Sequence, residues 1–469
     1  MTRVNSIVDK IAGLIGDGLL KPGERLLSVR AGAVEHGVSK NTMAEAYDRL
    51  VALGYLEAKQ GSGYYVARVR RASAEQQPAH VAEAVDSVSL LREQLVQTCS
   101  VRIGDGRPPP SWMERFEIGS APRFMAAARG LASEHGYGSP WGFLPLRERL
   151  ALTLGERSIK ASPDQILLTQ GANHALDLVA RQMLEPGDTV LVDSPGYYPL
   201  FGKLRLSRIA IVGVQRLQDG PDLDDLAAKA AAHKPKLFFT QSLAHNPTGS
   251  SITPAVAHRL LQVAGQHGFY VVEDDPFADV LPAASPRLAA LDQLDRVIYI
   301  GTFSKTLSAS LRVGYVAAKR PLIDRLCDVK MLTIVSTSDY VERIVYGFIA
   351  SGHYLRHLRK LKTRIEEHAE TAMLALSRIG VRLPPTVSGS YYLWGELPDH
   401  LNDVDLAQHA AERGIFLAPG TLFLPTRMPT APALRINIAY ATDPRFIDFL
   451  KDNLAPPGLA PPGGADRPA

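Results

Sequence analysis

The chain has 469 residues, of which 46% are hydrophobic and 21% charged, and its formal net charge is +4. This length exceeds one average domain, and the balanced composition excludes a fibrous or an intrinsically disordered protein. The sequence contains neither an apolar run long enough to cross a membrane nor a signal-peptide pattern, so we expect a cytoplasmic protein.

The basic excess is confined to the N-terminal segment. Residues 1–71 hold 11 Lys and Arg against 7 Asp and Glu, whereas the rest of the chain is balanced at 41 against 41. This distribution favours a polyanionic partner for the N-terminal segment. The cysteines, Cys99 and Cys327, fit neither a disulfide framework nor a zinc spacing, and we expect both to be inert thiols.

The N-terminal segment predicts three helices and a hairpin. Apolar residues at spacings of three and four indicate an amphipathic helix over 4–19, and Ser28 can cap a second helix that ends at Gly37. Ser39 can cap a third helix that ends at Gly54, and a hairpin follows around Gly61 and Gly63. We therefore expect a compact first domain over residues 1–67.

The remaining chain predicts a linker, a large α/β domain and a disordered tail. Residues 68–100 begin as a polar stretch without periodicity and are interpreted as a linker, in which one amphipathic piece precedes a break at "GDGRPPP". Over residues 101–454, apolar β-branched runs alternate with helical stretches, which favours a mostly parallel sheet covered by helices. Residues 455–469 are rich in Pro and Gly and predict disorder. The expected strands are "QILLT", "TVLVD", "KLFFT", "FYVVEDD" and "RVIYIG".

Four of these strands end in residues that suit one cofactor. Sites in α/β sheets form beyond the carboxyl ends of strands, where this chain places the helix start at Gly171 and Ala172, then Asn246, Asp274 and Lys305. A lysine that forms a Schiff base and a carboxylate that keeps a pyridine nitrogen protonated are what pyridoxal phosphate requires. Each residue alone can be read as a turn, a cap or a solvated side chain; the combination and order favour the cofactor site.

This region resembles the class I and II aminotransferases of fold type I. The matching motifs are "YGSPWGFLPLRE", "TQGANHALDL", "DSPGYYPL", "HNPTG", "VVEDDPF", "GTFSKTLSASLRVGY" and "ALRINIAY". The resemblance implies Lys305 as the Schiff-base lysine, Asp274 as the partner of the pyridine nitrogen and Arg435 as the clamp for an amino acid carboxylate. It further implies a homodimer and assigns the remaining cofactor contacts: Asn246 to the ring hydroxyl, Tyr197 to ring stacking, Gly171, Ala172, Thr302, Ser304 and Arg312 to the phosphate, and Tyr137 to the neighbouring subunit's phosphate.

One departure from the aminotransferase pattern concerns a phenol. The family usually carries a tyrosine two or three positions after the aspartate, whereas this chain has Pro276 and Phe277 there. Loss of that donor should alter the proton balance of the Schiff base, which argues against efficient transamination rather than against cofactor binding.

The N-terminal domain resembles the GntR-type winged helix-turn-helix. The motifs lie in "LKPGERLLSVRAGAVEHGVSKNTMAEAYDRLVALGYLEAKQGSGYYV"; Leu27 replaces the usual proline and Lys40 stands where arginine is common. The resemblance implies that the third helix enters the major groove with Ser39, Lys40, Asn41 and Thr42 foremost, while Arg30 contacts phosphate and Gly61 shapes the wing. The alternative is a module for protein contacts.

The whole chain resembles the MocR/GntR regulators. We therefore expect a transcription regulator that binds operator DNA as a homodimer and senses pyridoxal phosphate or an amino compound. The alternatives are an active aminotransferase with a vestigial DNA-binding domain and a cofactor-binding protein without a DNA function. His353 and His357 stand one helical turn apart, but no third ligand is near in sequence and we expect no metal site.

Overall fold

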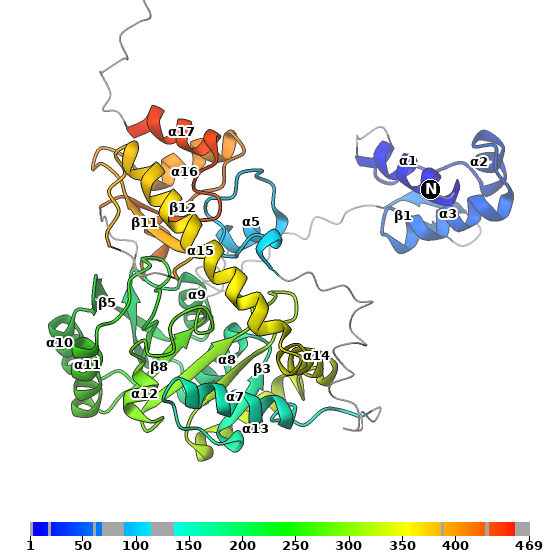
Figure 1. Cartoon of the computed structure of the whole chain (residues 1–469). Coiled ribbons are helices and arrows are strands. Elements are labelled where there is room, and N and C mark those ends of the chain that lie inside the picture. Colours follow the sequence, from blue (N-terminus) through cyan, green and yellow to red (C-terminus); the bar gives the residue numbers. More distant parts are fainter. Residues whose placement is uncertain are drawn as a thin grey trace, which may run out of the picture. The chain divides into compact units, whose positions relative to one another are not determined.

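The computed structural model describes residues 3–16, 20–59, 62–67, 89–113, 136–385, 389–426 and 431–454. The chain divides into two compact units, Met1–Gln77 and Pro78–Ala469. Figure 1 shows the smaller unit in blue and the larger unit in cyan to red.

The first unit has the three helices and the hairpin that its sequence predicts. These are α1 (Arg3–Gly16), α2 (Val29–Glu35), α3 (Lys40–Ala52), β1 (Leu56–Lys59) and β2 (Gly63–Val66). Ser28 and Ser39 are confirmed as N-caps, because their hydroxyls accept hydrogen bonds from the backbone N–H groups of Ala31 and Thr42. A small core that includes Ile7, Met43 and Leu50 joins the helices to the hairpin.

The second unit alternates strands and helices along most of its length. Its helices are α5 (Ser89–Val96), α7 (Leu144–Glu156), α8 (Ala172–Met183), α9 (Tyr198–Leu206), α10 (Leu223–His233), α11 (Pro254–His267), α12 (Leu288–Asp292), α13 (Arg320–Ile334), α14 (Asp339–Ala350), α15 (His353–Arg378), α16 (Asp403–Glu412) and α17 (Pro444–Leu454). Short 3-10 turns cover Pro110–Trp112, Pro163–Gln165 and Gly420–Phe423.

Eight strands form the large sheet, in the order β3-β10-β9-β8-β7-β4-β5-β6. They are β3 (Ile166–Thr169), β4 (Thr189–Ser194), β5 (Ala210–Leu217), β6 (Gly220–Pro221), β7 (Leu237–Thr240), β8 (Tyr270–Asp275), β9 (Val297–Thr302) and β10 (Gly314–Ala317). The pairs from β5 through β4, β7 and β8 to β9 are parallel, whereas β10 runs antiparallel to β3 and β9, and β6 runs antiparallel to β5. The prediction of a mostly parallel sheet is confirmed, and β5, β6 and β10 are strands that the sequence reading missed.

Helices cover both faces of this sheet, as continuous apolar strands require. In β7, Phe238 packs into a core with α7, α10, α11, α12 and α14, while Leu237 and Phe239 pack into a second core with α8, α9 and α13. Strand side chains alternate between the two cores because successive residues point to opposite faces.

A smaller antiparallel sheet lies toward the C-terminus. It contains β11 (Tyr392–Glu396), β13 (Ala433–Asn437) and β12 (Ala418–Pro419), in that order. Helices α15, α16 and α17 pack on it through a third core that includes Leu361, Leu406 and Phe449. In Figure 1 the long helix α15 runs from the large sheet to this smaller part.

The predicted linker 68–100 ends in a helix that belongs to the fold. Helix α5 lies inside the range 68–100 that was predicted as linker, yet its residues Leu90 and Gln94 are buried against the rest of the second unit. The predicted linker is therefore too long at its C-terminal end, because an apolar helix face anchors it to the fold. Residues 68–88 and the predicted disordered tail 455–469 lie outside the described residues. Within the described part of the chain, no helix is long and apolar enough to span a membrane.

Candidate functional site

The carboxyl ends of β8 and β9, and the loops after β3 and β7, bring most of the predicted site residues together. Asp274 lies near the end of β8, and Lys305 follows β9 by three residues. Gly171 is the N-cap of α8 directly after β3, and Asn246 lies in the loop after β7. The site is thus assembled from segments more than 130 residues apart in the sequence.

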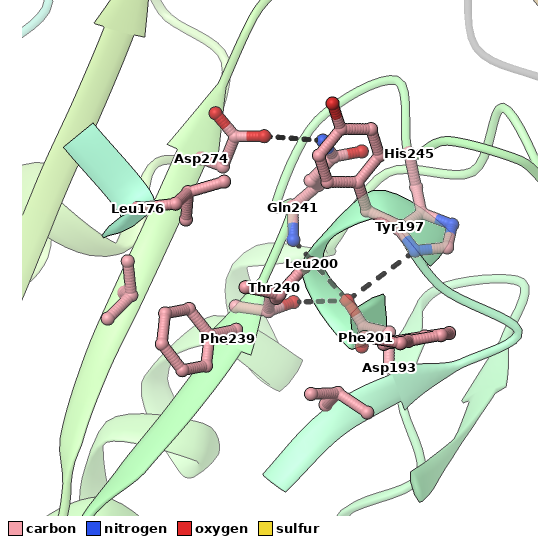
Figure 2. Close-up of a pocket in the computed structure, with 12 residues that line it drawn as sticks. Leu176, Asp193, Tyr197, Leu200, Phe201, Phe239, Thr240, Gln241, His245 and Asp274 are labelled. Carbon is pink, nitrogen blue, oxygen red and sulfur yellow. Dashed lines mark hydrogen bonds and ion pairs between the residues drawn. The ribbon is translucent and has the colours of Figure 1, made fainter. Parts of the chain in front are cut away.

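A buried amide holds the Asp274 carboxylate in place. Gln241 Nε2 donates to Asp274 Oδ2 at 2.7 Å (Figure 2). The Oε1 of the same amide accepts from the backbone N–H of Asn246 at 2.8 Å. The other carboxylate oxygen, Asp274 Oδ1, is buried and has no partner among the described residues. Burial, the largest effect, raises the pKa of Asp274 to about 6, and Gln241 and Lys305 oppose that shift. Asp274 therefore offers one open acceptor for a cationic or N–H group.

A second buried carboxylate, that of Asp193, stabilises the end of β7 and the loop that follows it. Asp193 Oδ2 accepts from Thr240 Oγ1 at 2.8 Å and lies 3.5 Å from His245 Nε2, as Figure 2 shows. Arg216 contacts the same oxygen at 3.3 Å. These contacts fix the positions of Thr240 and His245 on either side of Gln241. Sequence reasoning missed Gln241, although its place directly after "KLFFT" was a usable signal.

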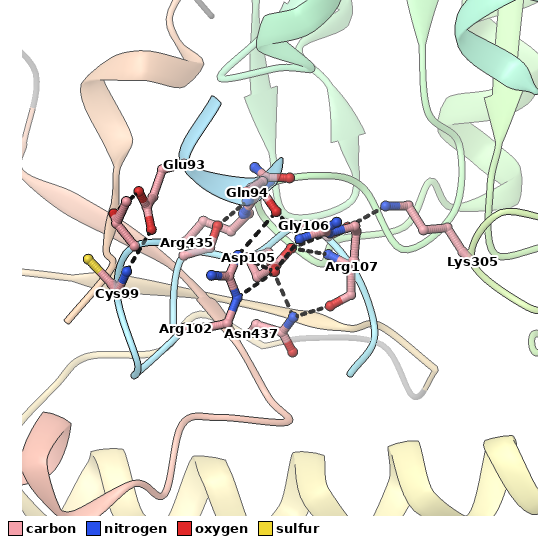
Figure 3. Close-up of polar contacts among 12 residues, drawn as sticks. Glu93, Gln94, Cys99, Arg102, Asp105, Gly106, Arg107, Lys305, Arg435 and Asn437 are labelled. Carbon is pink, nitrogen blue, oxygen red and sulfur yellow. Dashed lines mark hydrogen bonds and ion pairs between the residues drawn. The ribbon is translucent and has the colours of Figure 1, made fainter. Parts of the chain in front are cut away.

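The Lys305 amine is turned toward the N-terminal part of this unit. Its Nζ donates to the carbonyl oxygen of Gly106, as Figure 3 shows. Removal from water, then the charge of Arg435, lowers the pKa of Lys305 to about 8, against the opposing effects of Asp105 and Asp274. A lowered pKa increases the fraction of neutral amine, which is the nucleophilic form.

Arg435 is fixed between two aromatic rings. It is only 1% exposed, and its guanidinium lies 4.9 Å from the ring centres of both Tyr392 and Phe423. Nη1 donates to Asn246 Oδ1 at 3.0 Å and Nη2 donates to the Gly104 carbonyl at 2.7 Å, whereas Nε is buried without a partner among the described residues. A guanidinium held this rigidly is suited to bind a carboxylate through two parallel hydrogen bonds.

Small residues and hydroxyls lie around the start of α8. Gly171 has φ 75°, and a Cβ at this position would come within 3.0 Å of Arg312 Nη2. Gly314 permits close approach of β10, since a Cβ there would meet the Gly171 backbone at 2.8 Å. Thr302 Oγ1 bonds to Ser304 Oγ at 3.1 Å, and Arg312 is exposed above Gly171. Together with Ala172, these groups form a cradle at a helix N-terminus that suits an anion.

A segment that was interpreted only as a break completes the site. Residues 102–107 enter beside Lys305, and Asp105 accepts hydrogen bonds from both Arg102 and Arg107. Both arginines also donate to the Gln94 carbonyl oxygen in α5 (Figure 3). Glycine and proline content alone did not reveal that "GDGRPPP" is mostly buried, because its burial depends on the β13 and α5 contacts.

Tyr137 is the one predicted cofactor residue that does not lie with the others at the sheet edge. Its side chain is 86% exposed. Lys330 of α13 anchors the loop that carries Tyr137. Its Nζ donates to Pro140 O at 2.8 Å, Leu168 O at 2.9 Å and Thr337 Oγ1 at 3.0 Å. Lys330 is fully buried, so it ties the loop to the end of β3.

Replacing Lys330 with methionine is expected to lower the free energy of unfolding of the second unit by about 3 kcal/mol, because two buried carbonyl groups would lose their donor. Urea unfolding of the full chain checks this result. The matched control is Lys160→Met, since the Lys160 side chain is exposed. Equal unfolding midpoints for the two variants would contradict the anchoring role.

The first unit presents the predicted DNA residues at two helix starts, with Arg30 in the first turn of α2 and Ser39, Lys40, Asn41 and Thr42 at the start of α3. Arg30, Lys40 and Asn41 are exposed, Thr42 is partly buried, and the Ser39 hydroxyl caps α3. Gly61 lies outside the described residues. In the second unit, His357 contacts the Thr306 carbonyl at 2.9 Å. Across the described ranges, no three or more His, Cys, Asp or Glu side chains gather in a way that could hold a metal ion.

The geometry fits the cofactor that the sequence predicts. An amine with a lowered pKa, an open buried carboxylate oxygen, an aromatic ring at Tyr197 and an anion cradle converge at one sheet edge. This fold and site define the class of fold-type I aminotransferase-like proteins.

Comparison with known proteins agrees with that class. Residues 102–448 match "Aminotransferase class I and II", and residues 3–66 match "Bacterial regulatory proteins, gntR family". The chain therefore belongs to the class I and II aminotransferase family and carries an N-terminal GntR helix-turn-helix domain. This aminotransferase family typically uses pyridoxal phosphate.

Several relatives share both domains or the larger one. The chain is 29% identical over 438 residues to the uncharacterized HTH-type transcriptional regulator YdcR of Escherichia coli, covering 90% of this chain and 92% of that protein. It is 29% identical to the probable rhizopine catabolism regulatory protein MocR of Rhizobium meliloti, covering 79% and 76%. The Pyrococcus horikoshii kynurenine aminotransferase, solved in complex with PMP, matches with a TM-score of 0.70 and 25% identity, covering 81% and 94%.

Proposed function

We propose that this protein is a MocR-type transcription regulator of the cytoplasm that binds DNA through its first unit and senses pyridoxal phosphate or an amino compound through its second. The observation that carries the proposal is that one chain retains both an exposed basic helix start in a GntR domain and a buried polar site around Lys305. Relatives that match over nearly their full length are named as transcriptional regulators.

The residues of the second unit would hold the cofactor as follows. Lys305 would bind its aldehyde, Asp274 its pyridine nitrogen and Asn246 its ring hydroxyl, while Tyr197 would stack on the ring. Gly171, Ala172, Thr302, Ser304 and Arg312 would hold its phosphate. When bound, the cofactor supplies an electrophilic carbon and an electron-withdrawing ring for amino compounds. Arg435 would select compounds that carry a carboxylate.

A homodimer would complete the site. Tyr137 is exposed, and its neighbour Gly138 lies against the Thr337–Asp339 turn. Leu332, Val335 and Tyr340, all near that turn, are also exposed. A second copy that covers these apolar side chains would place Tyr137 at the partner's phosphate, and two first units would then meet two DNA half-sites.

The contacts of Lys305 suggest how ligand state reaches the DNA-binding unit. The amine is bonded to Gly106, the 102–107 segment is bonded to Gln94, and α5 follows residues 68–88 in the chain. Covalent use of the amine would change its hydrogen bond to Gly106. The free energy available for regulation is bounded by the difference in ligand affinity between the two arrangements.

An active aminotransferase is the second candidate. The buried Arg435, the retained Lys305 and the likeness to the Pyrococcus horikoshii aminotransferase favour it. Phe277 opposes it, because no phenol stands at that position. Steady-state assays with a panel of amino donors discriminate the candidates, since rapid release of oxo acid would contradict a purely regulatory role.

Fluorescence anisotropy on DNA from the upstream region of the gene tests the DNA function. We expect specific binding that changes when pyridoxal phosphate is added. Lys40→Ala should weaken binding and reduce the slope of log affinity against log salt by about one, because one phosphate contact is lost. Lys160→Ala serves as the control. Absence of specific binding in both cofactor states would contradict the regulator and leave the enzyme or a cofactor-binding protein.

A further inference from the structure

Two donors converge on one backbone oxygen in the site. Tyr392, the first residue of β11, is 1% exposed, and its hydroxyl donates to the Gly106 carbonyl oxygen at 2.9 Å. Lys305 Nζ donates to that same oxygen. A shared acceptor places the Tyr392 phenol and the Lys305 amine within two hydrogen-bond lengths of each other.

The Tyr392 ring also adjoins the position that lacks a phenol. Phe277 is fully buried, and its ring centre lies 5.7 Å from that of Tyr392, with the two planes at 73°. The Tyr391 ring also packs on Phe277, with ring centres 5.2 Å apart, but its hydroxyl donates to the backbone carbonyl of Lys305 at 3.1 Å. Of these two neighbouring tyrosines, only Tyr392 therefore shares an acceptor with the lysine amine.

We propose that Tyr392 supplies the phenolic hydrogen-bond donor beside the Lys305 nitrogen, in place of the donor that Phe277 cannot provide, and so sets the proton balance of the cofactor-linked lysine. The inference rests on the proposed binding of pyridoxal phosphate at Lys305. It assigns to β11 a role that the sequence "GSYYLW" does not reveal, since a short run of aromatic and apolar residues predicts only a buried strand.

The surroundings of Tyr392 keep its hydroxyl protonated. Burial raises the pKa of Tyr392 to about 12; Arg435 opposes the shift, and Asp105 and Asp274 add to it. The phenol therefore remains a donor throughout the pH range in which the lysine nitrogen titrates. The charged or titratable groups that face Tyr392 and Lys305 come from several elements: Asp105 and Arg107 from the 102–107 segment, Tyr197 and Tyr198 at α9, Asp274 from β8, Tyr391 beside β11 and Arg435 from β13.

The expected direction follows from the chemistry of a donor. The Tyr392 hydroxyl competes with Lys305 for the Gly106 carbonyl oxygen, which makes that oxygen a weaker acceptor for an N–H of the lysine. A weaker acceptor stabilises the protonated form of the nitrogen less, so the hydroxyl lowers the pKa of the nitrogen. Removing the hydroxyl should therefore raise the pH at which the cofactor-linked Lys305 nitrogen loses its proton.

The experiment is a pH titration of the visible absorbance band of the full chain saturated with pyridoxal phosphate. Tyr392→Phe is expected to raise the midpoint by about one pH unit, the equivalent of one net hydrogen bond. The matched control Tyr391→Phe should shift the midpoint by less than about 0.3 pH unit, because its hydroxyl bonds to the Lys305 carbonyl and not to the Gly106 oxygen that the amine shares. Adding Phe277→Tyr to the Tyr392→Phe variant should restore the wild-type midpoint.

Other outcomes overturn the inference in identifiable ways. An unchanged midpoint in Tyr392→Phe overturns it alone and leaves cofactor binding intact. Absence of the visible band in the wild-type protein overturns it together with the cofactor proposal. If Tyr392→Phe fails to bind cofactor, the single variant Phe277→Tyr in the wild-type background decides whether the inference holds. That variant should leave the midpoint nearly unchanged, whereas a fall of about one pH unit would show that the site had no phenol to begin with.

Discussion

Replacing Lys305 with alanine is expected to abolish the visible absorbance band that pyridoxal phosphate acquires on binding and to abolish the effect of the cofactor on DNA affinity. The lysine amine is the proposed covalent attachment point, and its hydrogen bond to Gly106 connects the site to the 102–107 segment. Both properties depend on one nitrogen, so the variant should lose both together. Absorbance and fluorescence anisotropy on the same preparation measure them.

The control for this prediction is Lys160→Ala, which removes an exposed lysine from the same unit. It should retain the band and the cofactor response. A Lys305→Ala protein that keeps the band would show that another lysine binds the cofactor. Loss of the band with an unchanged cofactor effect on DNA affinity would instead show that sensing does not pass through the covalent link.

Replacing Arg435 with leucine is expected to weaken the binding of amino acids by about 100-fold while leaving the visible band of the bound cofactor in place. The guanidinium is held between Tyr392 and Phe423 and has a buried Nε without a partner among the described residues. A charge-assisted pair of hydrogen bonds to a carboxylate contributes roughly 3 kcal/mol, which corresponds to that factor.

The measurement compares an amino acid with the matching amine that lacks the carboxylate, in spectral titrations of the cofactor-saturated protein. The wild-type protein should prefer the acid, and Arg435→Leu should bind both compounds equally weakly. Arg445→Leu, which removes an exposed arginine that pairs with Asp443, is the control. A wild-type preference for the amine would rule out Arg435 as the carboxylate contact and redirect the search for an effector toward simple amines.

Local patterns predicted the parts of this site that belong to the ends of strong elements. "YVVEDD" and "RVIYIG" are continuous apolar strands, so Asp274 and Lys305 could be placed at one sheet edge from the order of the strands alone. Gly171 indicated a helix start in the same way. Ser28 and Ser39 were predictable as caps because a cap depends on the few residues beside it.

Weak or unusual elements were missed for a physical reason. The β10 strand has four residues and is buried on both faces between β3 and β9, so its sequence shows no alternation. Helix α5 was assigned to the linker because its amphipathic face is short. Only its packing against the rest of the second unit distinguishes it from a polar connection.

By itself, the sequence determined the two domain classes and the strand ends at which Lys305 and Asp274 lie, and its resemblance to the aminotransferases pointed to Arg435. Tertiary structure alone decided that Gln241 holds Asp274, that Gly106 lies against Lys305 and that Tyr392 shares its acceptor. The difference arises because strands, caps and turns reflect interactions among neighbours in the chain. Contacts between residues 199 or 286 positions apart depend on how whole elements pack, which no local pattern encodes.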